Sequence, residues 1–365
     1  MDIEQRIKEL EEEIKRTQYN KATEKHILRL KARIAYLKRE LEERRKKQKA
    51  QRSKGIKKSG DATVAFIGPP SVGKSLLFNR LTNAKSEVAD YAFTTLDVLP
   101  GVLKYKGAEI QLLDMPGLIE GASYGRGKGR EILSIARNSD LILLIFDIFS
   151  VELMDIVQKE LYNFGIRLNQ EPPKISIKKK DRGGINVAST VPLSMEKESI
   201  AAMVREFGYI NADILIKEDI TPERLVDFLA GNRVYVPAVL VINKIDMAEE
   251  NTLKEIQKRF SSWNPVLVSA LHGEGLDALK ERIFQDAGLI RIYLKPQSGK
   301  IDYDAPLILR RGAVIEDICK SLHRDFVEKF RYAMVWGKSV KFPGQHVGLD
   351  HRVEDEDVVR IVLKR

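Results

Sequence analysis

Apolar residues near the start of the chain recur every three or four positions, the spacing typical of amphipathic helices. Two such stretches are present, with apolar positions Ile3, Ile7, Leu10 and Ile14 in the first and Ile27, Leu30, Ile34, Leu37 and Leu41 in the second. Tyr19 and Asn20 fall between the two stretches. The pattern therefore predicts two helices that fold back on each other as a hairpin.

From Thr63 onward, short apolar runs alternate with stretches of helical spacing. Six runs are predicted to be strands, namely Thr63–Ile67, Gly101–Tyr105, Ile110–Leu113, Leu141–Phe146, Ala238–Ile242 and Val266–Val268. Such alternation is typical of an α/β fold with a mostly parallel, doubly wound sheet, in which ligands bind at the carboxyl ends of the strands. We therefore expect functional residues directly after these strands.

The alternation is interrupted between about residues 165 and 236, where two helices are predicted near Glu196–Phe207 and Pro222–Leu229. This stretch is too long for a structureless loop in a compact domain, so we expect an inserted α+β subdomain. After Ala287, the order of short strands and one helix fits a small β-grasp module. The predicted domains are residues 1–60 (hairpin and basic linker), 61–164 with 237–287 (α/β domain), 165–236 (insertion) and 288–365 (β-grasp module).

The charge balance favours contact with polyanions such as RNA, because 62 Lys and Arg residues exceed 52 Asp and Glu residues. Nine Lys or Arg residues lie between Arg44 and Lys58 without an acidic residue among them. This segment is either a contact for phosphate backbones or a solvated linker.

Cys319 is the single cysteine, which suits a reducing compartment. The charged first thirty residues and the short apolar runs predict a cytoplasmic protein without a membrane span.

The strongest chemical signal is a glycine-rich loop between a predicted strand and a predicted helix. Its residues Gly68, Pro69, Pro70, Ser71, Val72, Gly73, Lys74 and Ser75 match the pattern G-x-x-x-x-G-K-S, and Leu76 begins the helical run. In such a loop, backbone N–H groups at a helix N-terminus bind phosphates, the lysine contacts the β and γ oxygens and the serine hydroxyl binds Mg²⁺. We expect all nine residues to contact a nucleotide.

Two further segments are expected at the γ-phosphate and the metal. Asp114, Met115, Pro116 and Gly117 follow a predicted strand, and we expect Asp114 to hold Mg²⁺ through water and the N–H of Gly117 to meet the γ-phosphate. Phe93, Thr94 and Thr95 lie in a stretch without regular periodicity, and Thr95 is the expected metal ligand. Thr94 is the alternative, and either threonine can instead be an ordinary strand residue. The expected catalytic groups are Lys74, Thr95 and Gly117.

Recognition of the base is assigned to residues after the last two strands. Asn243, Lys244 and Asp246 belong to an N-K-I-D sequence, and Ser269, Ala270 and Leu271 follow the final strand. A carboxylate at Asp246 accepts hydrogen bonds from two N–H donors of guanine that adenine does not offer. Since an unpaired buried carboxylate is costly, the sequence predicts GTP rather than ATP as the ligand. The N–H of Ala270 is expected on the guanine oxygen.

The motifs in this order resemble the translation-factor class of GTPases, which have a P-loop GTPase domain. The sequences Tyr91-Ala-Phe-Thr-Thr-Leu and Asp114-Met-Pro-Gly-Leu-Ile-Glu-Gly-Ala-Ser, followed by glycines 125, 127 and 129, resemble the Obg branch. The N-terminal helices, the insertion and the C-terminal module resemble its developmentally regulated (DRG) members, which end in a TGS domain. The resemblance implies a cytoplasmic GTPase that cycles between GTP and GDP and is associated with ribosomes or translation.

Two positions differ from common GTPase patterns. Leu118 stands where many GTPases have a water-orienting glutamine, so slow intrinsic hydrolysis and a possible role for an activating or stabilising protein partner are expected. Ser71 stands where relatives that use K⁺ often have Asn, so K⁺ stays open beside Mg²⁺ as a cofactor.

The alternative function is an RNA- or ribosome-binding module in which the nucleotide is structural. A monomer is expected, and Asp147 and the five histidines are left out of the site.

Overall fold

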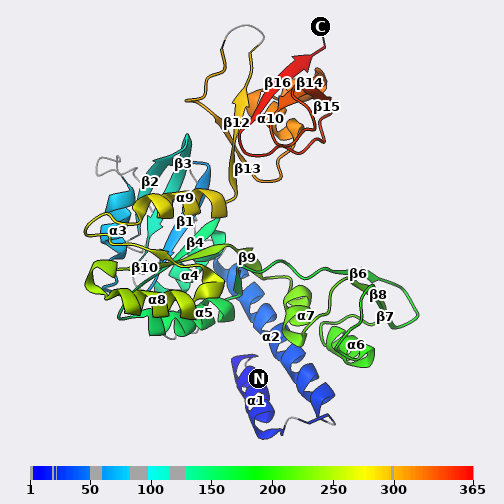
Figure 1. Ribbon diagram of the computed structural model, residues 1–365. Helices are drawn as coiled ribbons and strands as arrows, with labels where there is room; N and C mark the ends of the chain where they lie inside the picture. The colour runs from blue at the N-terminus through cyan, green and yellow to red at the C-terminus, as the bar shows by residue number, and fades with distance from the viewer. Residues whose placement is uncertain are drawn as a thin grey trace. The chain divides into compact units, whose positions relative to one another are not determined.

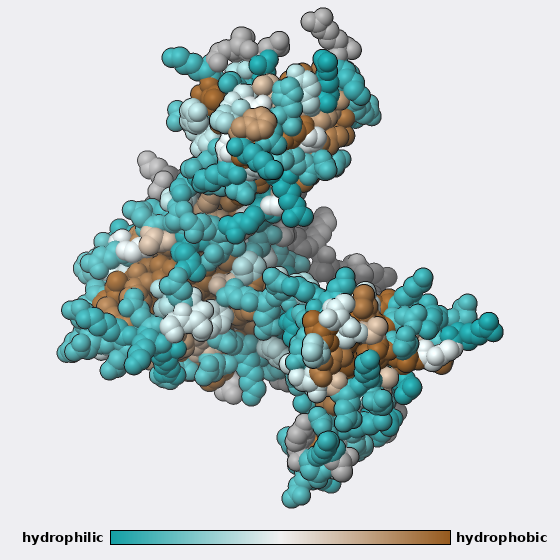
Figure 2. Space-filling view, turned by 45° about the vertical axis from the view of Figure 1, so that its right-hand side comes forward, coloured by the Kyte–Doolittle hydropathy of each residue, from teal (hydrophilic) through white to brown (hydrophobic). Residues whose placement is uncertain are grey.

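The computed structural model describes residues 3–18, 20–21, 23–49, 60–82, 98–115, 128–296 and 300–364. The chain forms two compact units, one comprising residues 1–55 and 165–235 and the other residues 56–164 and 236–365. No helix within the described ranges combines the length and the apolar composition needed to cross a membrane. Hydrophilic residues cover most of the face shown in Figure 2.

A six-stranded sheet forms the centre of the second unit, in the order β11-β10-β4-β1-β3-β2. Its strands are β1 (Ala62–Ile67), β2 (Leu99–Tyr105), β3 (Ala108–Asp114), β4 (Leu141–Asp147), β10 (Ala238–Asn243) and β11 (Val266–Leu267). All neighbours pair in parallel except β2, which is antiparallel to β3. The predicted α/β fold with a mostly parallel, doubly wound sheet is thus confirmed.

Helices cover both faces of this sheet (Figure 1). They are α3 (Lys74–Leu81), α4 (Lys128–Asn138), α5 (Met154–Asn163), α8 (Glu250–Arg259) and α9 (Leu276–Asp286), with short 3-10 turns at Val151–Leu153, Ile245–Met247 and Ser261–Trp263. Apolar residues of α3 and α9 share one core with alternate residues of the strands. Phe66 of β1 and Phe78 of α3 meet edge to face, with ring centroids 5.9 Å apart. This packing fixes the helix that follows the glycine-rich loop.

The first unit combines the N-terminal helices with the inserted segment. It contains α1 (Ile3–Arg16), α2 (Glu24–Lys49), β5 (Ile166–Leu168), β6 (Ile175–Lys179), β7 (Ile185–Ser189), α6 (Lys197–Glu206), β8 (Ala212–Ile216) and α7 (Pro222–Ala230). Leu28, Ala32 and Ala35 of α2 lie in the same core as the apolar residues of α6, α7 and the sheet β6-β8-β7. The hairpin and the insertion therefore stabilise each other.

Local sequence explains the bounds of α7. Thr221 accepts a hydrogen bond from the N–H of Arg224, Pro222 occupies the first helical position, and Gly231 ends the helix in a left-handed conformation with φ 62°. These are favourable residues for a helix start and a helix end. On the helix, buried Asp227 accepts two hydrogen bonds from Arg167 of β5, which connects α7 to the two-stranded sheet of β5 and β9 (Val234–Val236).

The C-terminal residues form a β-grasp module, as the sequence predicts. Its strands are β12 (Leu289–Leu294), β13 (Leu307–Arg310), β14 (Phe330–Trp336), β15 (Gln345–Val347) and β16 (Asp357–Leu363), and its helices are α10 (Ile315–Leu322) and α11 (Asp325–Glu328). The sheet has the order β13-β12-β16-β14-β15. Apolar residues of α10 pack on one face of this sheet, and Cys319 is buried there.

Candidate nucleotide site

The carboxyl ends of parallel strands bring the predicted motifs together. Phe66 of β1 is in register with Asp114 of β3, and Asp147 of β4 is in register with Asn243 of β10. The glycine-rich loop begins directly after β1, so it lies at the same edge of the sheet. Of the described motif residues, the structure thus places the phosphate loop, the metal-binding aspartate and the base-recognition residues at one edge.

The backbone of the glycine-rich loop requires small residues at two positions. Gly73 has φ 86°, and a Cβ there would lie 2.4 Å from Nδ2 of Asn243. A Cβ at Gly68 would lie 2.0 Å from the carbonyl oxygen of Ile145. Any side chain at either position would displace a strand end or the loop. Ser71 also has a positive φ of 65°, which directs its carbonyl oxygen toward Lys244.

Lys74 is buried, and its ammonium is bound by the loop itself. Nζ donates to the carbonyl oxygens of Pro69 at 2.6 Å and Gly68 at 3.3 Å. Burial lowers the pKa of Lys74, while the nearby charge of Asp114 acts in the opposite direction. Carbonyl oxygens are weaker partners for a cation than phosphate oxygens. A bound phosphate would therefore compete well for this lysine.

Asp114 has a free coordination position. Its Oδ1 atom is buried and, within the described part of the chain, has no hydrogen-bond partner. Burial raises the pKa of Asp114, and a hydrogen bond with Ser75 and the charge of Lys74 act to lower it. An unpartnered carboxylate oxygen beside a serine hydroxyl is the donor chemistry that Mg²⁺ prefers. Ser75 and Asp114 thus fit a magnesium ion.

Hydrogen bonds hold the base-recognition loops against the glycine-rich loop. Asn243 Nδ2 donates to the carbonyl oxygen of Val72 at 2.9 Å, and its Oδ1 accepts from the N–H of Ala270 at 3.0 Å. Ser269 Oγ donates to Asp246 Oδ1, and this hydrogen bond lowers the pKa of Asp246. Asp246 therefore carries a negative charge at neutral pH and can accept from N–H donors.

Asp147 contacts this network, although sequence reasoning left it out of the site. Lys244 Nζ donates to Asp147 Oδ2 at 2.5 Å and to the carbonyl oxygen of Ser71 at 3.0 Å. Burial acts to raise the pKa of Asp147, but hydrogen bonds from Lys244 and Ser150 outweigh it, so the pKa is lowered. The sequence signal that could identify Asp147 is a carboxylate at the end of a strand. In the sheet, that strand lies between two strands that are followed by motifs.

Comparison with known families matches nearly the whole chain. The family described as "50S ribosome-binding GTPase" matches residues 63–180, the C-terminal region of that domain matches residues 182–289, and the TGS domain matches residues 290–363. A GTP-binding protein of Methanocaldococcus jannaschii is 56% identical, with 100% of this chain and 94% of the relative covered. Developmentally-regulated GTP-binding protein 1 of Xenopus laevis is 44% identical, with 98% of each covered.

The chain belongs to the family of developmentally regulated GTP-binding (DRG) proteins. Developmentally-regulated GTP-binding protein 2 of Homo sapiens is 43% identical, with 100% of both chains covered. The resemblance to DRG proteins seen in the motifs is confirmed, and so is the TGS domain. As a member of this family the chain is a GTPase.

Solved structures give a weaker likeness. The G domain of the T. maritima FeoB iron transporter is 22% identical, covers 62% of this chain and 98% of that chain, and has a TM-score of 0.32. The assignment to the DRG family therefore depends on the sequence relatives.

Several expected site residues of this DRG protein lie outside the described residues. They are Phe93, Thr94, Thr95, Pro116 and Gly117, together with Leu118. Met115 is buried, and Leu271 is largely exposed with its carbonyl oxygen accepting from Arg80 at 2.7 Å. The threonine assignment and the γ-phosphate contact of Gly117 stay predictions.

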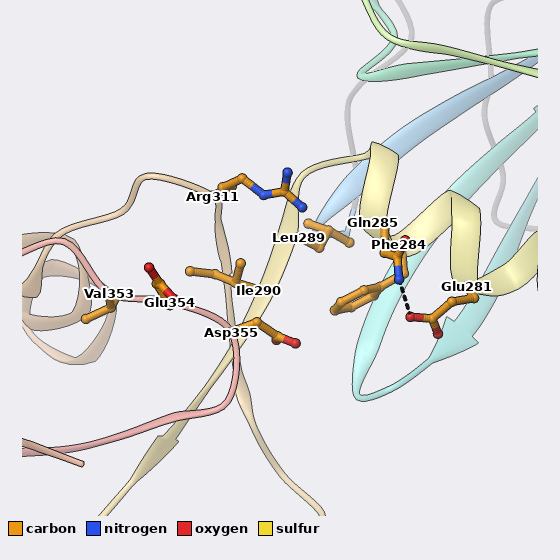
Figure 3. Close-up of a pocket in the computed structure, with 9 residues that line it drawn as sticks. All are labelled: Glu281, Phe284, Gln285, Leu289, Ile290, Arg311, Val353, Glu354 and Asp355. Atoms are coloured by element: carbon orange, nitrogen blue, oxygen red, sulfur yellow. Dashed lines mark hydrogen bonds between the residues drawn. The ribbon is translucent and has the colours of Figure 1, made fainter. Parts of the chain in front are cut away.

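A pocket elsewhere in the DRG chain contains none of the nucleotide motifs. It has a volume of about 370 Å³ and is lined by Glu281, Phe284, Gln285, Leu289, Ile290, Arg311, Val353, Glu354 and Asp355 (Figure 3). Within it, Gln285 Nε2 donates to Glu281 Oε1 at 2.8 Å, one turn away on α9. The nucleotide assignment therefore depends on the strand-edge residues and not on this pocket.

Proposed function

We propose that this chain acts as a magnesium-dependent switch that hydrolyses GTP to GDP and phosphate while associated with ribosomes or RNA. The observation that carries the proposal is the convergence of Lys74, Asp114 and Asp246 at the carboxyl edge of one sheet. These three side chains have the chemistry for phosphate, metal and guanine, respectively.

Phosphate binding is assigned to the glycine-rich loop and the helix that follows it. The N–H groups at the start of α3 and the ammonium of Lys74 would bind the β and γ oxygens. In doing so Lys74 would exchange its two carbonyl partners, Pro69 and Gly68, for phosphate. Ser75 and Asp114 would hold Mg²⁺, which would supply positive charge against the phosphate oxygens.

Guanine binding is assigned to Asn243, Lys244, Asp246 and Ala270. Asp246 is oriented by the hydroxyl of Ser269, and one of its oxygens takes that hydrogen bond. Asn243 joins the strand that bears the guanine loop to the phosphate loop through Val72. The guanine-binding residues and the phosphate loop are therefore joined by a direct hydrogen bond, so a nucleotide would contact both at once.

Switching is assigned to Thr95 and Gly117, as in the sequence prediction. Loss of the γ-phosphate would release contacts that these residues make to it. With Leu118 in place of a glutamine, fast hydrolysis needs a water-orienting group from elsewhere in the chain, from a partner or from a monovalent cation. K⁺ stays a candidate for that last role.

Association with ribosomes or RNA is supported by the charge of the chain and by the printed description of the matching family. The net charge is +10, and the family covering residues 63–180 is described as a ribosome-binding GTPase. Lys178 and Lys179 are exposed on β6 of the insertion, and Lys179 lies over the ring of Tyr209 at 5.2 Å. Such residues suit a phosphate-rich surface.

The proposal is tested by phosphate release from GTP with and without purified ribosomes. We expect slow release by the chain alone, faster release with ribosomes, and co-sedimentation with ribosomes that is stronger with a non-hydrolysable GTP analogue than with GDP. Equal co-sedimentation with either nucleotide and unchanged hydrolysis would instead favour the binding module in which nucleotide is structural.

A further inference from the structure

Arg80, near the end of α3, donates two hydrogen bonds to the loop that follows β11. Its Nε donates to the carbonyl oxygen of Ala270 at 3.1 Å, and its Nη2 donates to the carbonyl oxygen of Leu271 at 2.7 Å. Both acceptors are backbone atoms of residues 269–272, which we call the base loop. The helix that follows the glycine-rich loop is thereby joined to the segment expected to read the guanine base.

The helical end of this contact is firmly held. Leu77, Phe78 and Leu81 of α3 are buried in the same core as Ala270 of the base loop. Close-packed core side chains leave a helix little freedom to shift. The backbone of Arg80 is therefore fixed, although its side chain lies near the surface, and the guanidinium can act as a rigid support for the base loop.

Two further hydrogen bonds connect this support to the carboxylate that selects the base. The carbonyl oxygen of Leu271 and the N–H of His272 belong to one planar peptide unit and point in opposite directions. That N–H donates to Ser269 Oγ at 3.2 Å, and Ser269 Oγ donates to Asp246 Oδ1. Arg80 thus holds the peptide unit that orients the serine hydroxyl, and the hydroxyl orients the carboxylate.

Other hydrogen bonds support the base loop at other atoms. The N–H of Ala270 donates to Asn243 Oδ1 at 3.0 Å, and the N–H of Gly273 donates to the carbonyl oxygen of Ser269 at 2.8 Å. Neither of these bonds holds the peptide unit that follows Leu271. The loop can therefore stay folded without Arg80 while the orientation of this peptide unit, and of the hydroxyl that it positions, is lost.

We propose that Arg80 is a positioning residue for guanine selection. It acts through Ser269, whose hydroxyl occupies one lone pair of Asp246 and leaves the others to accept the two N–H donors of guanine. Hydrogen bonds weaken steeply when donor and acceptor are misaligned, so a rotated carboxylate accepts poorly from both donors. This inference rests on the proposed function, since it concerns how the same site selects its base.

The proposal is tested in the full-length chain by comparing the affinities for GDP and inosine diphosphate in titration calorimetry. Inosine lacks the exocyclic amine, so it offers Asp246 one N–H donor instead of two. The parent chain should bind GDP about tenfold or more tightly than inosine diphosphate, the worth of one hydrogen bond to a charged group. In Arg80→Ala, this preference should fall at least about threefold, because GDP loses two oriented hydrogen bonds and the inosine nucleotide loses one.

Two other substitutions separate hydrogen bonding from packing. Arg80→Met keeps most of the aliphatic stem but has no donor, so its base preference should fall as in the alanine variant. Arg80→Lys keeps a cationic donor that can reach one carbonyl oxygen, so its preference should lie between those of Arg80→Met and the parent chain.

Arg282→Ala on α9 is the matched control. Arg282 Nη1 also donates to a backbone carbonyl oxygen, that of Asn264, at 3.2 Å, and the guanidinium pairs with Asp286. This contact lies before β11 and does not involve the base loop. The control should therefore keep the parent preference for GDP over inosine diphosphate, even if its melting temperature falls.

A parent-like base preference in both Arg80→Ala and Arg80→Met would overturn the inference, because a merely structural arginine changes stability and not the choice of base. An equal loss of preference in Arg282→Ala would also overturn it. Circular dichroism checks that the variants are folded. If the parent chain itself binds neither nucleotide, or binds both equally, the guanine site of the proposed function fails instead.

Discussion

Lys244 Nζ is hydrogen-bonded to Asp147 Oδ2 at 2.5 Å, and the same ammonium reaches the carbonyl oxygen of Ser71 at 3.0 Å. Lys244 belongs to the guanine-recognition sequence, Asp147 ends a central strand, and Ser71 lies in the phosphate loop. The lysine has a left-handed backbone with φ 61°, which a residue with a Cβ rarely adopts without compensating contacts. The hydrogen bond to Ser71 therefore joins the guanine-recognition sequence to the phosphate loop, and the ion pair with Asp147 holds Lys244 in place for it.

Replacing Asp147 should weaken nucleotide binding without removing a nucleotide contact. Asp147→Ala leaves Lys244 partly buried without its counter-charge, and truncating one partner of such a pair costs about 2 kcal/mol or more. We expect an affinity for GDP that is lower by tenfold or more in titration calorimetry. Asp147→Asn, which keeps an oxygen acceptor, should recover part of the loss. Asp155→Ala, at an exposed position on α5, is the control. Parent-like affinity of the alanine variant would show that the pair is not needed.

Lys74→Ala and Ser75→Ala should each abolish or severely weaken Mg·GTP binding. The first removes the phosphate-binding cation and the second removes a metal ligand. Both variants should stay folded, because Lys74 is bound only by carbonyl oxygens of its own loop among the described residues. Titration calorimetry measures the affinity and circular dichroism the fold. Unchanged GTP affinity in both folded variants contradicts the site assignment.

Asp246→Asn should change the preferred base from guanine towards xanthine. An amide can donate to the oxygen that replaces the exocyclic amine of guanine, whereas the carboxylate only accepts. GTP binding should fall by about 10-fold or more, while xanthosine triphosphate binding rises. Competition with a fluorescent nucleotide measures both. A variant that keeps the parent preference for guanine over xanthine would refute the role of Asp246.

As the pH falls, magnesium-dependent nucleotide affinity should be lost at a higher pH than it would be with a solvent-exposed aspartate as the metal ligand. Burial raises the pKa of Asp114, so this carboxyl binds its proton at a higher pH than a solvent-exposed aspartate. Since the metal requires the ionised form, affinity should rise with pH through the raised pKa and level off above it. Calorimetric titrations of Mg·GDP across pH 4–7 measure this, and Asp114→Asn, which does not ionise, is the control. A flat profile in the parent chain contradicts the metal role.

The basic segment from Arg44 to Lys58 should contribute to RNA affinity through phosphate contacts. Reversing Arg44, Lys47, Arg52 and Lys57 to Glu should flatten the salt dependence of binding to ribosomal RNA. GTP affinity should survive, because the segment precedes β1. Deletion of residues 1–58 is a poorer test, since Leu28, Ala32 and Ala35 of α2 belong to the core of the insertion. An unchanged slope would indicate that the segment is a solvated linker. Lys178–Lys180 would then be the next candidate for the RNA contact.

The sequence alone determined the parts of the chain that depend on local pattern. Short continuous apolar runs identify the central strands because both of their faces are buried, and period-3.6 apolar spacing identifies helices because each buries one face. The strand Ala238–Ile242 is therefore observed as Ala238–Asn243, and the helix near Pro222–Leu229 as Pro222–Ala230. The glycine-rich loop is identifiable for a related local reason, since Gly73 has a φ of 86°, which residues with a side chain rarely adopt. These constraints act between residues that are close in sequence.

Tertiary structure alone decided which distant residues meet. Nothing in the periodicity of α2 indicates that its apolar face packs on α6 and α7, because an apolar stripe specifies burial but no partner. The sequence shows Asp147 only as a residue at the end of a strand. The pairing of β4 with β10 brings it to Lys244. The stack of Tyr332 on His346 likewise needs the pairing of β14 with β15. In each case the decisive contact joins separate elements, and only the folded chain sets their register.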